Sequence, residues 1–177
     1  MQSKRLYHIV TTLIVIFASM SYFAMASGHG ISYHHVVVRE TNKHMPDTTT
    51  DLYRQVYWAR YVDWTLTTPL LLLDLCLLAG LSGGVIVMTM IADIIMILTG
   101  LFAAFGNEGG QQWGYYAMSC LAYLVIIYQL AVHGRAQAAQ KDGKTANFFN
   151  AIAGFTLILW TLYPMYVIQQ LCLYTPY

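Results

Sequence analysis

An arginine, two aspartates and a threonine share one face of an apolar segment, Arg60-Tyr-Val-Asp-Trp-Thr-Leu-Thr-Thr-Pro-Leu-Leu-Leu-Leu-Asp74. At about 100° per residue in an α-helix, Asp63 and Asp74 differ by only about 20° around the helix axis. Arg60 and Thr67 fall on the same side. Ionisable side chains are expensive at bilayer depth, so by default they indicate a functional site there.

The spacing along the helix axis suggests what that site would do. The two aspartates are about 16 Å apart along the axis, roughly half the thickness of the hydrocarbon layer. One carboxyl group would then lie near the middle of the membrane and the other towards one side. Polar contacts between helices are the alternative interpretation, but three costly groups on one stripe favour a path for protons or ions.

The composition indicates the element that must hold this stripe, a membrane helix. The chain has 177 residues, of which 58% are hydrophobic and only 10% are charged; soluble domains carry about 25% charged residues. The net charge of +1 gives no electrostatic reason to expect a nucleic-acid partner. The three cysteines fit no metal-binding spacing and are interpreted as apolar packing residues.

Five apolar stretches are long enough to cross a bilayer, which needs about 20 residues each, at residues 6–26, 56–79, 83–105, 113–133 and 147–170. The sequence therefore predicts an all-α, integral membrane helical bundle of one domain, residues 1–177. The first stretch also resembles a signal peptide, but it is long and polar for one. The segment His133–Lys144 is predicted to be a polar connection between helices.

The positive charges of the predicted loops orient the bundle. With the N-terminus inside, the inner side holds more of them (Lys4, Arg5, Arg135, Lys141 and Lys144) than the outer side (Arg39, Lys43 and Arg54). Because cytoplasmic loops are enriched in Lys and Arg, we predict a multi-pass protein with a cytoplasmic N-terminus, in the plasma membrane. The lipid bilayer is therefore a predicted partner of the protein.

Residues 27–54 form the one long polar segment, predicted to be extracellular and to contain a small β-hairpin. Four histidines gather there: His29, His34, His35 and His44. A metal site is conceivable, but solvated loop histidines are the favoured interpretation, and no metal ligand is assigned.

The 60–74 motif resembles the third helix of microbial (type 1) rhodopsins. Matches elsewhere are Ala92-Asp-Ile-Ile-Met-Ile-Leu-Thr-Gly100 to the fourth helix, Trp113-Gly-Tyr-Tyr-Ala-Met-Ser119 to the fifth and Leu159-Trp-Thr-Leu-Tyr-Pro164 to the sixth. The His-His loop and the stretch Leu101-Phe-Ala-Ala-Phe-Gly106 resemble the fungal branch most. The chain would then supply five of seven helices, the equivalents of helices two to six.

The resemblance implies a retinal protein whose chromophore is bound to a lysine as a protonated Schiff base. It implies that Asp63 is the proton acceptor and counterion and that Asp74 is the cytoplasmic proton donor. Arg60 matches the arginine of the outer proton network, and Thr67 matches a hydroxyl bonded to the acceptor. Tyr22 matches a tyrosine near the acceptor.

The resemblance also implies a chromophore wall, made largely of aromatic and small residues. Flat rings on either side of a polyene would form a stiff slot. Pro164 would permit a kink in the sixth helix. In most membrane bundles such residues are only packing, which is the alternative interpretation. The residues matched to this wall are Trp64, Thr68, Asp93, Met96, Gly100, Tyr116, Ser119, Trp160, Tyr163 and Pro164.

The chain departs from the family pattern at its lysines. There are four, Lys4, Lys43, Lys141 and Lys144, and all are predicted in loops or tails. Three interpretations stay open: a truncated or misassembled gene product, which is favoured; a fragment completed by a partner piece; or a lysine-free opsin relative that assists other membrane proteins. We further expect Asp63, Arg60 and Asp93 to face lipid or water in part, which would make the isolated chain poorly stable.

The function implied is light-driven outward proton transport, with this chain inactive by itself because no retinal lysine is found. The alternatives are a sensory photoreceptor of the same fold and a membrane chaperone that does not bind retinal. An enzyme is not expected, since the predicted membrane segments hold no nucleophile–base pair, phosphate loop or metal-ligand spacing. A homo-oligomer is compatible with the family.

Overall fold

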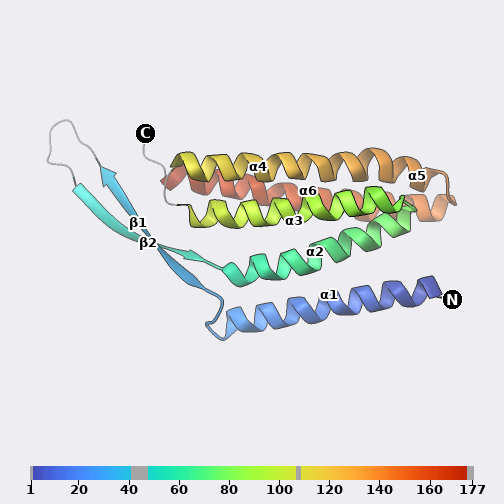
Figure 1. The fold of residues 1–177 in the computed structure, drawn as a ribbon, viewed down its shortest axis with the longest axis horizontal. Helices are drawn as coiled ribbons and strands as arrows, with labels where there is room; N and C mark the ends of the chain where they lie inside the picture. The colour runs from blue at the N-terminus through green and yellow to red at the C-terminus, as the bar shows by residue number, and fades with distance from the viewer. Residues whose placement is uncertain (1, 41–47, 107–108, 175–177) are drawn as a thin grey trace.

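The protein is a bundle of membrane-spanning helices with a β-hairpin at one end (Figure 1). The computed structural model describes residues 2–40, 48–106 and 109–174. Five of its helical segments are long and apolar enough to cross a membrane: Arg5–Ala26, Trp58–Ala79, Gly83–Phe105, Gly109–Ala139 and Gly143–Met165. The predicted integral, multi-pass membrane bundle is thus confirmed.

The elements follow the chain in a simple order. Helix α1 (Gln2–Ala26) leads into strands β1 (Ser32–Glu40) and β2 (Thr48–Val56). Helices α2 (Trp58–Ala79) and α3 (Gly83–Phe105) come next. Helix α4 (Gly109–Tyr128), a π-helical turn η1 (Gln129–Gly134) and helix α5 (Arg135–Ala139) form one continuous span, and α6 (Gly143–Tyr174) ends the described chain.

The two ends of the bundle differ in what they carry. The hairpin lies at one end, called the hairpin end here, and the N-terminus of α1 lies with α5 at the other, called the α5 end (Figure 1). Helix α1 lies along α2 at the side of the bundle. In α1, Val10 is buried, whereas the large apolar residues Ile9, Val15 and Phe23 are exposed, as expected for a helix that faces lipid.

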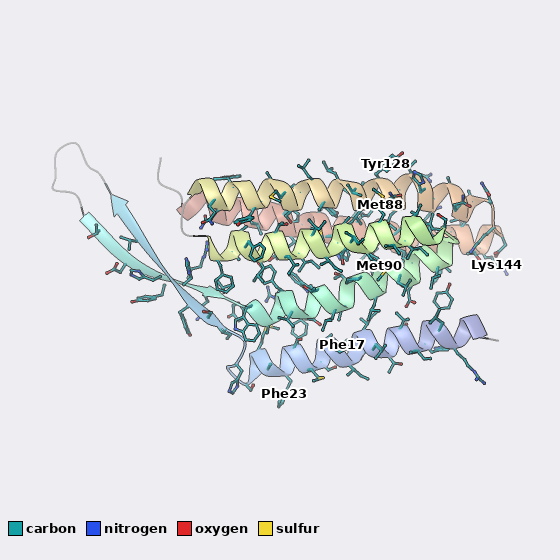
Figure 2. The ribbon with its side chains drawn as sticks, viewed as in Figure 1. Phe17, Phe23, Met88, Met90, Tyr128 and Lys144 are labelled. Carbon is teal, nitrogen blue, oxygen red and sulfur yellow. The ribbon has the colours of Figure 1, made fainter. Side chains whose placement is uncertain are left out.

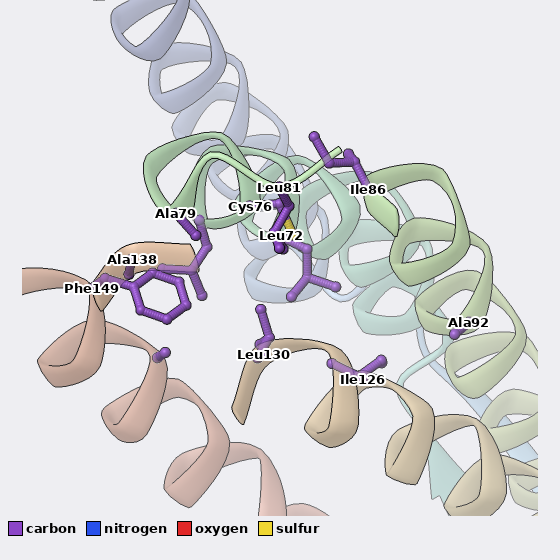
Figure 3. Close-up of a cluster of buried hydrophobic side chains, with 12 residues drawn as sticks. Leu72, Cys76, Ala79, Leu81, Ile86, Ala92, Ile126, Leu130, Ala138 and Phe149 are labelled. Carbon is purple, nitrogen blue, oxygen red and sulfur yellow. The ribbon is translucent and has the colours of Figure 1, made fainter. Parts of the chain in front are cut away.

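The buried apolar cluster occupies the half of the bundle nearer the α5 end. It gathers side chains from α2, α3, α4, η1, α5 and α6 (Figure 3). Its fully buried members include Leu72, Cys76, Ile126, Leu130, Ala138 and Phe149. This cluster holds the C-terminal half of α2, and therefore the helix that carries both aspartates of the stripe.

The hairpin is antiparallel, with Ser32 opposite Val56 and Glu40 opposite Thr48. Two contacts of the described residues attach it to the bundle. The Arg54 side chain donates a hydrogen bond to the carbonyl of Ala104, near the end of α3, and the ring of His34 lies edge-on to Phe105. The base of the hairpin thereby covers the end of α3.

The prediction of a polar connection over 133–144 is wrong for most of its length. The helical span continues through η1 and α5 to Ala139, so that only Gln140–Asp142 separates it from α6. A Cβ atom on Gly134 would lie 2.6 Å from the ring of Phe149, so this glycine lets α6 pack tightly here. Burial of Ala138 against the core then favours another helical turn.

Candidate functional site

The stripe predicted on α2 is present, and its middle is buried. Asp63 is 3% exposed and Thr67 is 6% exposed, whereas Arg60 and Asp74 are partly exposed. Asp93 of α3 has no exposed surface at all. The expectation that Asp63 and Asp93 face lipid or water is therefore wrong: the helices present in this chain already enclose them.

The carboxyl groups of the two stripe aspartates and of Asp93 on α3 are incompletely satisfied. The Oδ1 atoms of Asp63, Asp74 and Asp93 are buried, and none has a hydrogen-bond partner among the described residues. A buried polar group without a partner loses free energy relative to water. Such atoms need an explanation, and at Asp63 a cation or proton donor supplied by a cofactor would provide one.

The expected contact between Thr67 and the acceptor carboxyl group is not made. The Thr67 hydroxyl instead donates to the main-chain carbonyl of Asp63, at 2.9 Å. A threonine inside a helix commonly bonds the carbonyl four residues earlier, because its hydroxyl reaches that atom without strain. The role expected for Thr67 in a proton relay stays a prediction.

Arg60 makes aromatic contacts in this structure. Its guanidinium carbon lies 5.4 Å from the ring centroid of Tyr57 and 5.8 Å from that of Trp64, within the range of cation–π attraction. No ion pair between Arg60 and Asp63 occurs among the described residues. The rings hold the cation at the hairpin end of the stripe, one turn from Asp63.

Asp74 lies near the α5 end of the stripe, where α1 covers it. The Thr11 hydroxyl of α1 is 3.4 Å from Asp74 Oδ2, a long hydrogen bond. Leucines flank the carboxyl group in the sequence from Leu70 to Leu75. Asp74 therefore has a weak hydrogen bond from Thr11 and the Tyr7 side chain of α1 near it, with leucines beside it in the sequence.

Thr68 and Asp93 join α2 to α3. The Thr68 hydroxyl is 2.6 Å from Asp93 Oδ2 and also 2.6 Å from the carbonyl of Trp64. A hydroxyl has only one proton to donate. Both short contacts are satisfied if a protonated Asp93 donates to Thr68 while Thr68 donates to Trp64. Both residues belong to the set that the resemblance matches to the chromophore wall.

An aromatic group connects α2 with α6. The rings of Trp64 and Tyr163 meet edge to face with centroids 4.9 Å apart. The hydroxyls of Tyr61 and Tyr163 are 2.8 Å apart, and Tyr61 also meets Trp64 at 5.7 Å. Sequence analysis missed Tyr61; its position three residues before Trp64, on the same side of the helix, was the available signal.

The remaining wall residues lie between α3, α4 and α6. The Ser119 hydroxyl donates to the carbonyl of Met96 at 2.8 Å, and Tyr116 donates to the carbonyl of Pro164 at 3.2 Å. Gly100 faces Ser119 and Tyr61 across ordinary van der Waals distances. Met96 and Trp160 both pack against the buried apolar cluster.

Tyr22, which the resemblance matches to a tyrosine near the acceptor, is largely exposed in this structure. Its side chain on α1 is 53% exposed and has no hydrogen bond to the stripe among the described residues. Among the described side chains of α1, only Val10 is buried. A role for Tyr22 near Asp63 stays a prediction.

The two lysines whose side chains the structure describes, Lys141 and Lys144, are distant from Asp63. Lys141 donates to the carbonyl of Leu78 at the end of α2, about 22 Å along that helix from Asp63. Lys144 is exposed in the first turn of α6, rather than in a loop as predicted. The side chain of Lys4 and all of Lys43 lie outside the described residues, as does His44.

Two histidines of the segment 27–54 make hydrogen bonds within that segment. His35 Nε2 is 3.0 Å from Asp51 Oδ1 across the two strands, and both side chains are exposed. His29 Nδ1 is 3.2 Å from the Ser27 hydroxyl. No cluster of three metal-ligating side chains is found among the described residues.

Known proteins are similar to this chain in sequence. The family described as "Bacteriorhodopsin-like protein" matches residues 1–173. Opsin-1 of Neurospora crassa is 50% identical over 165 residues, which cover 92% of this chain and 54% of that protein. The opsin-like protein carO of Fusarium fujikuroi is 35% identical over 164 residues, covering 93% and 52%. The chain thus spans about half the length of these curated relatives.

A solved structure agrees closely with the fold. The light-driven proton pump of Leptosphaeria maculans is 55% identical, with a TM-score of 0.88 over 92% of this chain and 66% of that one. The light-driven proton pump of Coccomyxa subellipsoidea is 35% identical, with a TM-score of 0.79 over 92% and 67%.

Proposed function

The chain belongs to the bacteriorhodopsin-like family of microbial rhodopsins, and from this premise we propose that it provides the proton-translocating helices of a light-driven outward proton pump. The observation that carries the proposal is the stripe on α2, where Asp63 and Asp74 lie on one face with buried, unpartnered carboxyl oxygens. Two such groups about 16 Å apart form two stations of a proton path.

Asp63 is the proposed proton acceptor. A buried carboxylate is stable only beside a positive charge or a hydrogen-bond donor, and Asp63 Oδ1 has neither among the described residues. A cation bound next to this oxygen would keep Asp63 ionised until a proton arrives. Arg60, one turn away and held by Tyr57 and Trp64, supplies positive charge on the side to which the proton would leave.

Asp74 is the proposed proton donor. Its setting among leucines, with only the Thr11 and Tyr7 hydroxyl groups as polar neighbours among the described residues, disfavours the charged form, because desolvation penalises a carboxylate. A neutral carboxylic acid can keep its proton until a stronger base becomes available. Position 74 therefore favours transport over sensing.

The cofactor that the family implies is retinal, and the residues matched to its wall suit it. Trp64, Trp160 and Tyr163 provide flat rings, Met96 provides an apolar contact, and the unpartnered Asp63 oxygen suits a cationic group. When bound, retinal supplies light absorption and a protonated Schiff base. The attachment point does not fit: no lysine lies near Asp63 among the described residues.

Because of that lysine pattern, we expect the 177-residue chain by itself to form no Schiff base. The first measurement is the visible absorption spectrum of the chain in membranes with all-trans retinal. A band no different from that of free retinal is expected. A red-shifted band that is bleached by hydroxylamine would show that Lys141, Lys144 or another lysine reaches retinal, which would contradict this structure.

Pumping itself is tested in a chimera. The five spans of this chain replace the matching part of the Leptosphaeria maculans pump, which then supplies the rest of the protein. Illumination of cells should acidify the medium, Asp63→Asn should abolish the signal, and Asp74→Asn should slow turnover. A coloured chimera with a slow photocycle and no proton movement would indicate a sensor. A chimera that binds no retinal would favour a chaperone.

The orientation belongs to the same proposal. We infer that the α5 end is cytoplasmic and the hairpin end extracellular, in the plasma membrane. Arg5, Arg135, Lys141 and Lys144 lie in or beside helix ends at the α5 end, as positive charges of a cytoplasmic face do. The proposed partners are the lipid bilayer, retinal and further copies of this chain; no nucleic acid is proposed.

A further inference from the structure

The turn between α5 and α6 is attached to the last turn of α2. Lys141 Nζ donates a 2.8 Å hydrogen bond to the carbonyl of Leu78. Leu78 is one helical turn beyond Asp74, on the same face of α2. The side chain that makes this contact comes from a three-residue turn, Gln140–Asp142.

The end of α2 is shaped to receive this lysine. Gly80 adopts φ +82°, and the amides of Gly80 and Leu81 both bond the carbonyl of Cys76, which closes the helix. That closure leaves the carbonyl of Leu78 available to a side chain. A Cβ atom on Gly80 would lie only 2.9 Å from Lys141 Cε and Nζ, so the lysine lies across the bare face of the glycine.

The hydrogen bond from Lys141 to Leu78 joins the α5–α6 turn to α2, and the buried apolar cluster joins the same elements. Beneath the turn, Ala138, Phe149, Ala79 and Leu81 pack in the buried apolar cluster. Lys141 is therefore exposed to solvent beside the packed core. The negative end of the α2 helix dipole stabilises its positive charge there.

We propose that Lys141 is a positioning residue that limits the access of water and protons to Asp74 from the α5 end. This rests on the proposed function, in which Asp74 takes up a proton from that side. Lys141 acts in two ways: it keeps the last turn of α2 closed beyond Asp74, and its charge repels incoming hydronium. Opening the path requires the hydrogen bond to Leu78 to break.

Exchange of the Asp74 carboxyl proton with deuterium, followed by infrared spectroscopy, tests the proposal directly. The full chain is labelled with ¹³C-aspartate in lipid membranes, and the Asp74 carbonyl band is assigned by its loss in Asp74→Asn. In Lys141→Met, which removes the charge and the donor, the band should exchange about fivefold faster, as expected from the loss of one exposed helix-end hydrogen bond.

Two matched variants make the test specific. Lys144→Met removes the same charge from the exposed first turn of α6, at the same end of the bundle (Figure 2), and should leave the exchange rate unchanged. Lys141→Arg keeps a positively charged hydrogen-bond donor, so the Asp74 carboxyl group should exchange at the wild-type rate. Equal rates in the wild type and Lys141→Met, or equal acceleration by Lys144→Met, would overturn the proposal.

A purely structural tether predicts a different pattern. It would change the exchange of the Gly80 and Leu81 amides without changing that of the Asp74 carboxyl group, and that result would also overturn the proposal. The readout needs no retinal. If exchange at Asp74 does not depend on Lys141, the proposal for Lys141 fails, and the chimera can still pump protons. If the chimera moves no protons, the proposed pump function fails, and the exchange rate measured at Asp74 still stands.

Discussion

At the residue scale, the site depends on where each hydroxyl sends its one proton. Thr65, Thr67 and Thr68 all lie on α2 and all bond a main-chain carbonyl four residues earlier. Thr68 alone of the three, within the described residues, also reaches a side chain, that of Asp93. The same residue type in the same helix therefore has different consequences, according to the face on which it lies.

Thr68→Val should destabilise the bundle by about 1–3 kcal/mol, because it keeps the shape of the side chain but removes the hydrogen bond that the buried Asp93 makes with Thr68. Unfolding of the chain in mixed micelles, with added denaturing detergent, measures the change. Thr65→Val is the matched control and should have little effect, since only a main-chain bond is lost. Equal losses in the two variants would contradict the role given to Asp93.

The start of α6 should depend on pH through Asp142, an exposed residue outside the membrane spans. The Thr145 hydroxyl donates to its carboxylate at 2.6 Å, and the Thr145 amide donates at 3.3 Å. These bonds lower the pKa of the Asp142 carboxyl group. A group whose pKa is lowered by folding stabilises above its unfolded pKa, and this stabilisation is lost as the pH falls through the lowered value.

Hydrogen exchange at the first amides of α6 checks this dependence. Protection, corrected for intrinsic exchange, should be constant at neutral pH and should fall below the usual pKa range of aspartate. Asp142→Asn keeps an acceptor for the helix start but does not titrate, so its profile should stay flat. A wild-type profile as flat as that of the variant would show that the cap is unimportant.

At the element scale, glycines decide where elements approach one another. Gly30 joins α1 and the hairpin to α2: it has φ +75°, its carbonyl accepts the amide of Ala59 at 3.2 Å, and a Cβ atom there would lie 2.5 Å from Ala59 Cβ. Gly28 has a similar φ of +82° but open space around it. A side chain at Gly28 would cause backbone strain alone, whereas a side chain at Gly30 would cause backbone strain and a steric clash with Ala59.

Gly30→Ala should therefore destabilise more than Gly28→Ala. The latter should lose about 1–2 kcal/mol from left-handed backbone strain alone, and the former should lose about 1–3 kcal/mol more from overpacking. Detergent unfolding of both variants measures the difference. Adding Ala59→Gly to Gly30→Ala should recover the collision part, and a double variant no better than the single one would refute the close approach.

At the scale of the whole molecule, the bundle closes where α2 meets α6, although the contacting residues are far apart in the chain. The Tyr61–Tyr163 hydroxyl pair joins positions separated by 102 residues. It lies beside Trp64, in the wall proposed to hold retinal. Closure of the bundle and the shape of the candidate site are therefore coupled.

A double-mutant cycle should detect this coupling. Tyr61→Phe and Tyr163→Phe each keep the ring, and the two losses of unfolding free energy should be non-additive by about 0.5–1.5 kcal/mol. Tyr57→Phe, paired with Tyr163→Phe, is the control and should be additive, because the Tyr57 hydroxyl bonds Gln55 of the hairpin. Additive losses for Tyr61 and Tyr163 would mean that the pair contributes nothing to closure.

The sequence by itself determined the five spans and the α2 stripe, because membrane helices must satisfy their backbone within about 20 apolar residues and costly charges stand out in them. Only the tertiary structure decided which of those groups are enclosed, because burial depends on neighbours distant in the chain. Asp63 and Asp93 proved buried, Tyr22 exposed, and Arg60 held by rings. The continuation through η1 to Ala139 and the contact of Lys141 with α2 likewise arise from packing between helices, which no local pattern encodes.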